Sequence, residues 1–162
     1  MNAHDEVTYR LALAKGFLAE AEQDFDLNRW RSCVDNAQLT VENAGKAILA
    51  SFGVSPKTHE PARQVAAFLR HQSLPENIQE KMHRILPDLL ALGTTEHFLT
   101  DYGDEATYTL PWDLFTEESA VDALTAARRS FEQTQELLDI ITEWRREQAT
   151  ENNTSPDPPE DS

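Results

Sequence analysis

Residues 29–52, RWRSCVDNAQLTVENAGKAILASF, carry the clearest structural signal in the chain. Their apolar side chains recur in steps of four and three residues, at Trp30, Val34, Ala37, Val41, Ala44 and Ile48. An average step near 3.5 residues is typical of a helix that packs lengthwise against near-parallel or antiparallel neighbours. A polar row of Gln38, Glu42 and Lys46 follows the same helix, with the acid N-terminal to the base as in a favourable ion pair. Taken alone, this stretch predicts one helix of a soluble bundle and no chemistry.

The segments on both sides of this stretch repeat the same spacing. Apolar residues predict a first helix over about residues 5–25 and a last helix over about residues 116–146. The link of residues 26–28 is so short that the first two helices must form an antiparallel hairpin. Asn28, the last residue of that link, is the expected N-cap of the second helix.

Two shorter helices are predicted between the second helix and the last one. The first runs from the expected N-cap Thr58 to about His71. The other lies between the break at residues 73–75 and Gly93, and Pro87 should kink or split it. The expected fold is therefore an all-α, antiparallel up-and-down bundle of four to five helices.

Two further segments differ in composition from the predicted helices. Residues 94–115 predict a long loop before the last helix, and most of its aromatic rings are expected to pack inside. These rings are Phe98, Tyr102, Tyr108, Trp112 and Phe115. Residues 147–162 are acidic and rich in Pro and Asn, with almost nothing apolar. We therefore predict a bundle domain over residues 1–146 and a disordered acidic tail over residues 147–162.

The charge balance limits the classes of partner. The chain carries a formal net charge of −15, and its last sixteen residues hold five acids and no base. Because duplex DNA is bound mainly through Lys and Arg, this surface should repel it. No apolar run approaches the roughly 20 residues of a membrane span, and the polar N-terminus does not resemble a secretory signal. Together with the single cysteine, these features favour a cytoplasmic protein.

Familiar catalytic and metal-binding motifs are missing from the sequence. It contains no glycine-rich phosphate loop, no HExxH and no CxxC, so we expect neither a metal site nor a cofactor. Glu80-x-x-His83 occurs once, whereas a di-iron bundle needs the motif on two helices. Cys33 is interpreted as a buried inert thiol in preference to an activated one. On spacing alone, Glu42 and Lys46 are interpreted as a clamp on the bundle in preference to a site.

A longer pattern resembles a known family. Gln38, Glu42, Lys46-Ala47 and then Lys57-Thr58-His59 follow one another as in HEPN domains, with a short glycine-containing turn between helix and histidine. The resemblance covers about residues 7–145 and includes Tyr102-Gly103-Asp104-Glu105 and the Ala-rich helix over residues 120–138. It implies a homodimeric bundle of four or five helices. Many relatives are paired with a minimal nucleotidyltransferase as toxin–antitoxin modules, and catalytic relatives are metal-independent endoribonucleases with an Arg-x(4–6)-His motif.

The sequence departs from that nuclease pattern. No arginine is followed by a histidine after four to six residues, and the nearest pair, Arg63 and His71, has seven residues between. Asp101 stands before Tyr102, where relatives commonly carry arginine. We therefore expect a non-catalytic dimeric module that binds a nucleotidyltransferase. The resemblance places its nucleotide- or partner-binding residues at Glu42, Lys46, Lys57, His59 and Tyr102.

Two alternatives stay open at this point. One is a metal-independent endoribonuclease toxin with a divergent site, in which His59 or His97 is the acid/base and an arginine comes from elsewhere. The other is a helical scaffold unrelated to nucleotides.

Overall fold

A computed structural model describes residues 2–55, 59–93 and 99–154 of the chain. Its helices confirm the predicted all-α bundle, and the same residues contain no strand, only an isolated bridge between Asp104 and Thr109. The helices are α1 (Ala3–Asp26), α2 (Trp30–Ser51), α3 (Pro61–His71), α4 (Glu76–Ala91), α6 (Pro111–Leu114) and α7 (Glu117–Thr154). None of the helices in these ranges has an apolar, nearly uncharged stretch long enough to cross a bilayer.

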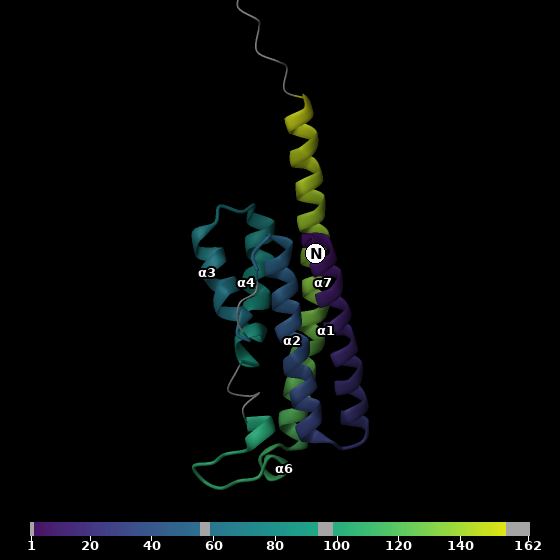
Figure 1. The fold of residues 1–162 in the computed structure, drawn as a ribbon, viewed down its shortest axis with the longest axis vertical. Coiled ribbons are helices and arrows are strands. Elements are labelled where there is room, and N and C mark those ends of the chain that lie inside the picture. The colour runs from purple at the N-terminus through teal and green to yellow at the C-terminus, as the bar shows by residue number, and fades with distance from the viewer. Residues whose placement is uncertain (1, 56–58, 94–98, 155–162) are drawn as a thin grey trace, which may run out of the picture.

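Helix α2 lies at the centre of the bundle, as its spacing predicted. Helices α1 and α7 pack along one side of it, and α3 and α4 pack on the other (Figure 1). Helices α1 and α2 form the predicted antiparallel hairpin, whereas α2 and α7 run in the same direction. Cys33 lies beside Ala120 near the two helix starts, and Arg145 lies over the Phe52 ring near the α2 end.

The parallel orientation of α2 and α7 follows from the path of the chain between them. Helix α4 runs antiparallel to α7, which is shown by the pairs Asp88–Arg129 and Lys81–Glu136. The chain therefore returns through α6 to the end of the bundle where α2 begins, and α7 starts from there (Figure 1).

Small residues let the helices approach closely along α2. Ala14 and Ala21 of α1 and Ala37 and Ala44 of α2 are fully buried. At Gly45, a Cβ atom would lie 2.9 Å from the Cγ atom of Pro61 at the start of α3. This contact holds the start of α3, and the residues just before it, against the middle of α2.

Two predicted helix boundaries differ from the structure. Asn28 is not the N-cap of α2. It has a φ of 57°, and Arg29 is the cap residue. In this position Asn28 ends α1, because its amide donates to the Phe25 carbonyl, and a left-handed residue there is a common way to terminate a helix. Pro87 does not split its helix, since α4 is continuous from Glu76 to Ala91. The predicted cap Thr58 lies outside the described residues, and Glu60 is the cap residue of α3.

Helix α7 extends beyond the predicted boundary at Arg146. Residues 147–154, which were predicted to be disordered, are helical. Local contacts support the extra turns: Arg146 pairs with Glu143 at 2.8 Å, and the Thr150 hydroxyl donates to the Arg146 carbonyl. Residues 155–162 lie outside the described residues, and their disorder stays a prediction.

The segment after α4 exposes its aromatic rings. Among the described rings only Phe115 is buried, while Tyr102, Tyr108 and Trp112 are exposed, so the prediction that most rings pack inside is wrong for this set. Phe98 lies outside the described residues. Gly103 has a φ of 70°, and a Cβ atom there would lie 2.2 Å from the Thr109 carbonyl oxygen. The segment thus folds back through backbone contacts at Gly103, which leaves its rings on the surface.

The same segment is anchored on the start of α2. The Arg31 guanidinium donates to the Thr100 carbonyl at 2.9 Å, and the Thr100 hydroxyl donates to Asp35 at 3.1 Å. Thr100 is fully buried. The exposed rings therefore belong to a segment that hydrogen bonds anchor to α2.

Candidate functional site

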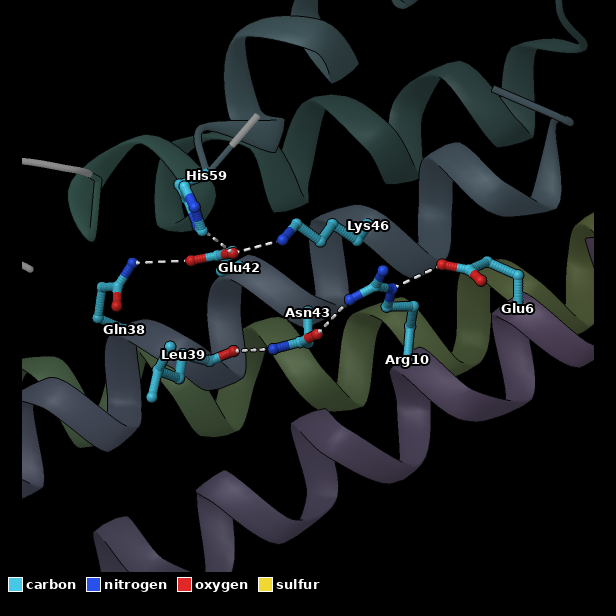
Figure 2. A network of polar contacts seen from close by, with 8 residues as sticks. All are labelled: Glu6, Arg10, Gln38, Leu39, Glu42, Asn43, Lys46 and His59. Carbon is cyan, nitrogen blue, oxygen red and sulfur yellow. Dashed lines mark hydrogen bonds and ion pairs between the residues drawn. The ribbon is translucent and has the colours of Figure 1, made fainter. Parts of the chain in front are cut away.

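Glu42 is the centre of a buried polar cluster on α2 (Figure 2). Its side chain is only 7% exposed, and three other side chains contact its carboxylate. Lys46 Nζ lies 2.5 Å from Oε1, Gln38 Nε2 donates to Oε2 at 3.3 Å, and His59 Nδ1 lies 3.3 Å from Oε1. Three of the four residues come from one row of the helix, and the fourth comes from the chain just before α3. We refer to Gln38, Glu42, Lys46 and His59 as the Glu42 cluster.

The members of this cluster differ in how far they reach solvent. Lys46 is mostly buried, whereas the His59 side chain is 83% exposed. The Gln38 side chain is buried, and its Oε1 atom has no hydrogen-bond partner among the described residues. Glu42 and Lys46 therefore neutralise each other inside the bundle, and His59 is the part of the cluster that another molecule can reach.

A small pocket opens beside the cluster. Its volume is about 170 Å³. Apolar side chains of α2, α3 and α4 form much of its wall, and Glu42, His59, Glu60 and Arg63 supply its polar groups. Arg63 Nε lies 3.2 Å from the Glu60 carboxylate, so that cation already has a partner. The polar lining of the pocket is acidic on balance.

A second polar group braces α1 against α2 next to the cluster. Arg10 Nε lies 2.7 Å from the Glu6 carboxylate, and its Nη1 donates to Asn43 Oδ1 at 3.4 Å (Figure 2). Asn43 Nδ2 in turn donates to the Leu39 carbonyl. These contacts fix the turn of α2 that carries Glu42.

The structure brings together only part of the predicted site. Glu42, Lys46 and His59 meet, whereas Tyr102 does not line their pocket and belongs to the exposed segment that is anchored at the start of α2. Lys57, and the alternative acid/base His97, lie outside the described residues. Across the described ranges, no three His, Cys, Asp or Glu side chains are placed to hold a metal ion.

The arrangement around His59 limits its chemistry. An imidazole that cuts RNA works beside a cation that stabilises charge on the phosphate. Here the group next to Nδ1 is the Glu42 carboxylate. This contact orients the ring and leaves most of the imidazole, which is 83% exposed, open to another molecule.

Two polar features were not singled out from the sequence. Asp88 of α4 and Arg129 of α7 form a two-point ion pair, with both N–O distances at 2.7 Å, and this contact raises the pKa of Arg129 further. The other is a groove of about 510 Å³ at the start of α2, which we call the arginine groove. It is lined by Asn28, Arg29, Trp30, Arg31, Ser32 and Trp112. The sequence feature that could have indicated this groove is a pair of arginines at a helix start in a strongly acidic chain.

Cys33 is buried, as predicted, and burial together with the nearby Asp24 raises its pKa to about 11.

At pH 8.5 we expect iodoacetamide to leave Cys33 unmodified in the folded protein and to alkylate it in 6 M guanidinium. Because the unfolded thiol ionises first, near pH 9, folding stability should fall as the pH rises from about 9 to about 11. Mass spectrometry and urea titrations check both points. A Cys33→Ala variant that shows the same pH-dependent loss would contradict this assignment.

The chain was compared with known families and structures. The HEPN domain model matches residues 7–138. The crystal structure of TT1696 from Thermus thermophilus superposes with a TM-score of 0.63 at 20% identity, covering 85% of this chain and 99% of that one. ST0689, an archaeal HEPN homologue, gives a TM-score of 0.59 at 17% identity, covering 85% and 98%. No curated protein sequence matches the chain.

Proposed function

The chain belongs to the HEPN domain family, and from that premise we propose that it is a non-catalytic homodimeric module that acts through protein contacts. Its proposed partner is a nucleotidyltransferase, in a pair of the toxin–antitoxin type, and its proposed location is the cytoplasm. Endoribonuclease activity at His59 or His97 is the second candidate.

The observation that carries this proposal is the exposure of three large apolar side chains in the segment between α4 and α6. Tyr102, Tyr108 and Leu110 are all exposed there, Tyr108 to 92%. We call these three residues the aromatic face. Tyrosine is enriched where proteins bind one another, and clustered exposed apolar side chains mark such contacts. Anchoring through Arg31 and Thr100 holds the face in place before a partner arrives.

Two features make RNA cleavage the weaker candidate. The sequence lacks the Arg-x(4–6)-His motif throughout. In the structure, His59 faces a carboxylate, and the arginine of the same pocket is paired with Glu60. A phosphate placed there would find both nearby cations, Lys46 and Arg63, already paired with carboxylates.

Nucleotide binding at the Glu42 cluster is also disfavoured by size and charge. Ligand pockets are usually about 300–1,000 Å³, larger than the 170 Å³ found here. Lys46 is buried against Glu42, and Arg63, which lines the pocket, is paired with Glu60. We infer that this pocket receives a side chain of a partner protein in preference to a nucleotide.

Wild-type protein should be a dimer at micromolar concentrations, with twice the 18.3 kDa mass of the chain by light scattering. Replacing Tyr108 and Leu110 together with serine should raise the dimer dissociation constant by about 100-fold, because both side chains are exposed at the proposed contact. Analytical ultracentrifugation measures the constant.

Tyr9→Ser provides the matched control, because Tyr9 is another exposed tyrosine but lies on α1. It should leave the dissociation constant unchanged. A wild-type monomer at all concentrations, or equal effects of the two variants, would rule out this dimer contact.

A nucleotidyltransferase encoded next to the gene of this protein should co-purify with it, and failure to do so would count against that partner.

A further inference from the structure

The arginine groove combines cations with an exposed aromatic ring at the end of the bundle where α2 begins and α6 lies (Figure 1). Its volume is about 510 Å³, and its lining includes Arg29, Arg31 and Trp112. Trp112 is 70% exposed, and the Arg31 guanidinium lies 5.8 Å from its ring centroid. An apolar group that packs on Trp112 therefore lies directly beside a cation.

The cations of this groove are only partly satisfied within the chain. The Arg29 side chain is 66% exposed, and its contact with Asp24, at 3.9 Å, is close to the outer limit of an ion pair. The other Asp24 oxygen accepts from Asn36 at 2.9 Å. Exposed ion pairs contribute little to stability, so a carboxylate that approaches Arg29 more closely can replace Asp24. Arg31 donates to the Thr100 carbonyl, and its buried Nε atom has no partner among the described residues.

The acids around the groove limit where a ligand can lie. An adjoining groove shares both arginines but adds three acids, Glu20, Asp24 and Asp35. The arginines therefore have carboxylates on one side and Trp112 on the other. An acidic ligand must approach from the Trp112 side, because the opposite side repels it. A ligand that alternates apolar rings with acids fits this arrangement better than a continuous row of acids.

The chain itself contains a segment of this kind. Residues 155–162, Ser-Pro-Asp-Pro-Pro-Glu-Asp-Ser, follow α7 and carry three prolines, three acids and no base. We call them the proline–acid segment. Proline-rich segments bind aromatic-lined grooves with little loss of conformational entropy, and arginine pairs closely with carboxylates. We propose that the arginine groove binds the proline–acid segment of a second copy of the chain, with the prolines on Trp112 and the carboxylates against the two arginines.

The length of α7 requires that the segment come from another copy. Cys33, which follows the last lining residue of α2, lies beside Ala120, so α7 begins at the same end of the bundle as the groove. From Ala120 to Thr154 the helix rises by about 50 Å, at about 1.5 Å per residue. A fully extended segment over residues 155–162 spans at most about 29 Å. It therefore cannot return to the groove of its own chain.

The contact joins two different surfaces, so it links copies head to tail and does not close on itself as a symmetric dimer does. No lining residue of the groove belongs to the aromatic face, so the inference does not rest on the proposed dimer. Protein at several hundred micromolar should therefore form larger species than protein at a few micromolar. Added salt should dissociate them, because it screens exposed charges.

Fluorescence polarisation with a fluorescein-labelled peptide of residues 153–162, amidated at its C-terminus, tests the site. The receptor is a full chain whose own segment cannot compete, because its acids are replaced in the triple variant Asp157→Asn, Glu160→Gln and Asp161→Asn. We expect saturable binding with a dissociation constant below about 300 µM. A peptide with the same three amides should bind at least tenfold more weakly. A peptide with alanine for the three prolines, and the same charge, should bind at least threefold more weakly.

Substitutions in the receptor locate the binding surface. Arg29→Gln and Trp112→Leu should each weaken binding of the peptide at least fivefold. Arg63→Gln is the matched control, because Arg63 is an exposed arginine outside the groove, and it should leave the affinity unchanged. Circular dichroism of Arg29→Gln should match that of the receptor, because the Arg29 side chain makes no capping bond.

Several outcomes would overturn the site. They are no saturable binding up to about 1 mM receptor, equal binding of the peptide without acids, or an unchanged affinity in Arg29→Gln. Equal binding of the alanine peptide, or equal losses in the Arg29 and Arg63 variants, would show a general attraction for acidic segments and would also overturn it.

Analytical ultracentrifugation tests the contact between whole chains. Concentrated wild type should contain species that the triple variant in the proline–acid segment lacks, while both proteins should behave alike at a few micromolar. Identical sedimentation of the two proteins at every concentration would rule out the head-to-tail contact, whether or not the dimer through the aromatic face exists.

Discussion

Glu42→Ala should lower the free energy of unfolding by about 3–5 kcal/mol, the largest effect that we expect from a single substitution. Glu42 and Lys46 are both mostly buried and lie 2.5 Å apart. Removing the carboxylate leaves the Lys46 ammonium without its partner inside the bundle, and one uncompensated buried charge is strongly destabilising. Urea titrations followed by circular dichroism measure the change.

The double variant Glu42→Leu with Lys46→Met separates the pair's structural role from any functional one. Because both charges are removed together, its stability should stay within about 1 kcal/mol of wild type. If these residues contact a partner, this folded variant should still lose that contact. A fall of less than about 1 kcal/mol for Glu42→Ala alone would show that the pair does not brace the bundle.

Gly45→Leu should lower the free energy of unfolding by about 3 kcal/mol. A Cβ atom at Gly45 would lie 2.9 Å from Cγ and 3.1 Å from Cβ of Pro61, with Leu89 Cδ2 at 3.6 Å. A leucine cannot fit without moving the start of α3 away from α2, and overpacking of this kind is destabilising. Because His59 precedes α3, its contact with Glu42 should also be lost. The same urea titrations measure the change in stability.

Gly16→Leu is the matched control for this substitution. Gly16 is also a helical glycine, but nothing lies within 4 Å of the position that a Cβ atom would take. Its replacement should leave stability unchanged or raise it by up to about 1 kcal/mol, through the better helix propensity of leucine. Equal losses in both variants would show that the close approach at Pro61 is not what constrains Gly45.

The sequence was most informative where local spacing determines structure. The apolar steps of α1, α2 and α7 follow from packing one face of each helix, so a single sequence reveals them. The Glu42–Lys46 pair follows from the same geometry, since residues four apart on a helix are neighbours. Burial of Cys33 was predictable because it lies beside the seam of α2.

Features that depend on tertiary contacts or on competing local roles were not predictable. Asn28 suited an N-cap by residue type, but the link is short and the structure uses it to end α1. The rings after α4 were expected inside because aromatic side chains usually bury, yet backbone contacts at Gly103 fold that segment and leave them exposed. The arginine groove forms only when α6 places Trp112 beside α2, residues far apart in the sequence.

Incubation of purified protein with total RNA, without metal, tests the central claim most directly. We expect no cleavage above background for wild type, because the His59 imidazole faces Glu42 and the arginine that lines the same pocket, Arg63, is paired with Glu60. Variants His59→Ala and His97→Ala should give the same trace, and so should His83→Ala, which removes an exposed histidine of α4. RNA cleavage by wild type that disappears in His59→Ala or His97→Ala, but persists in His83→Ala, would contradict a non-catalytic module.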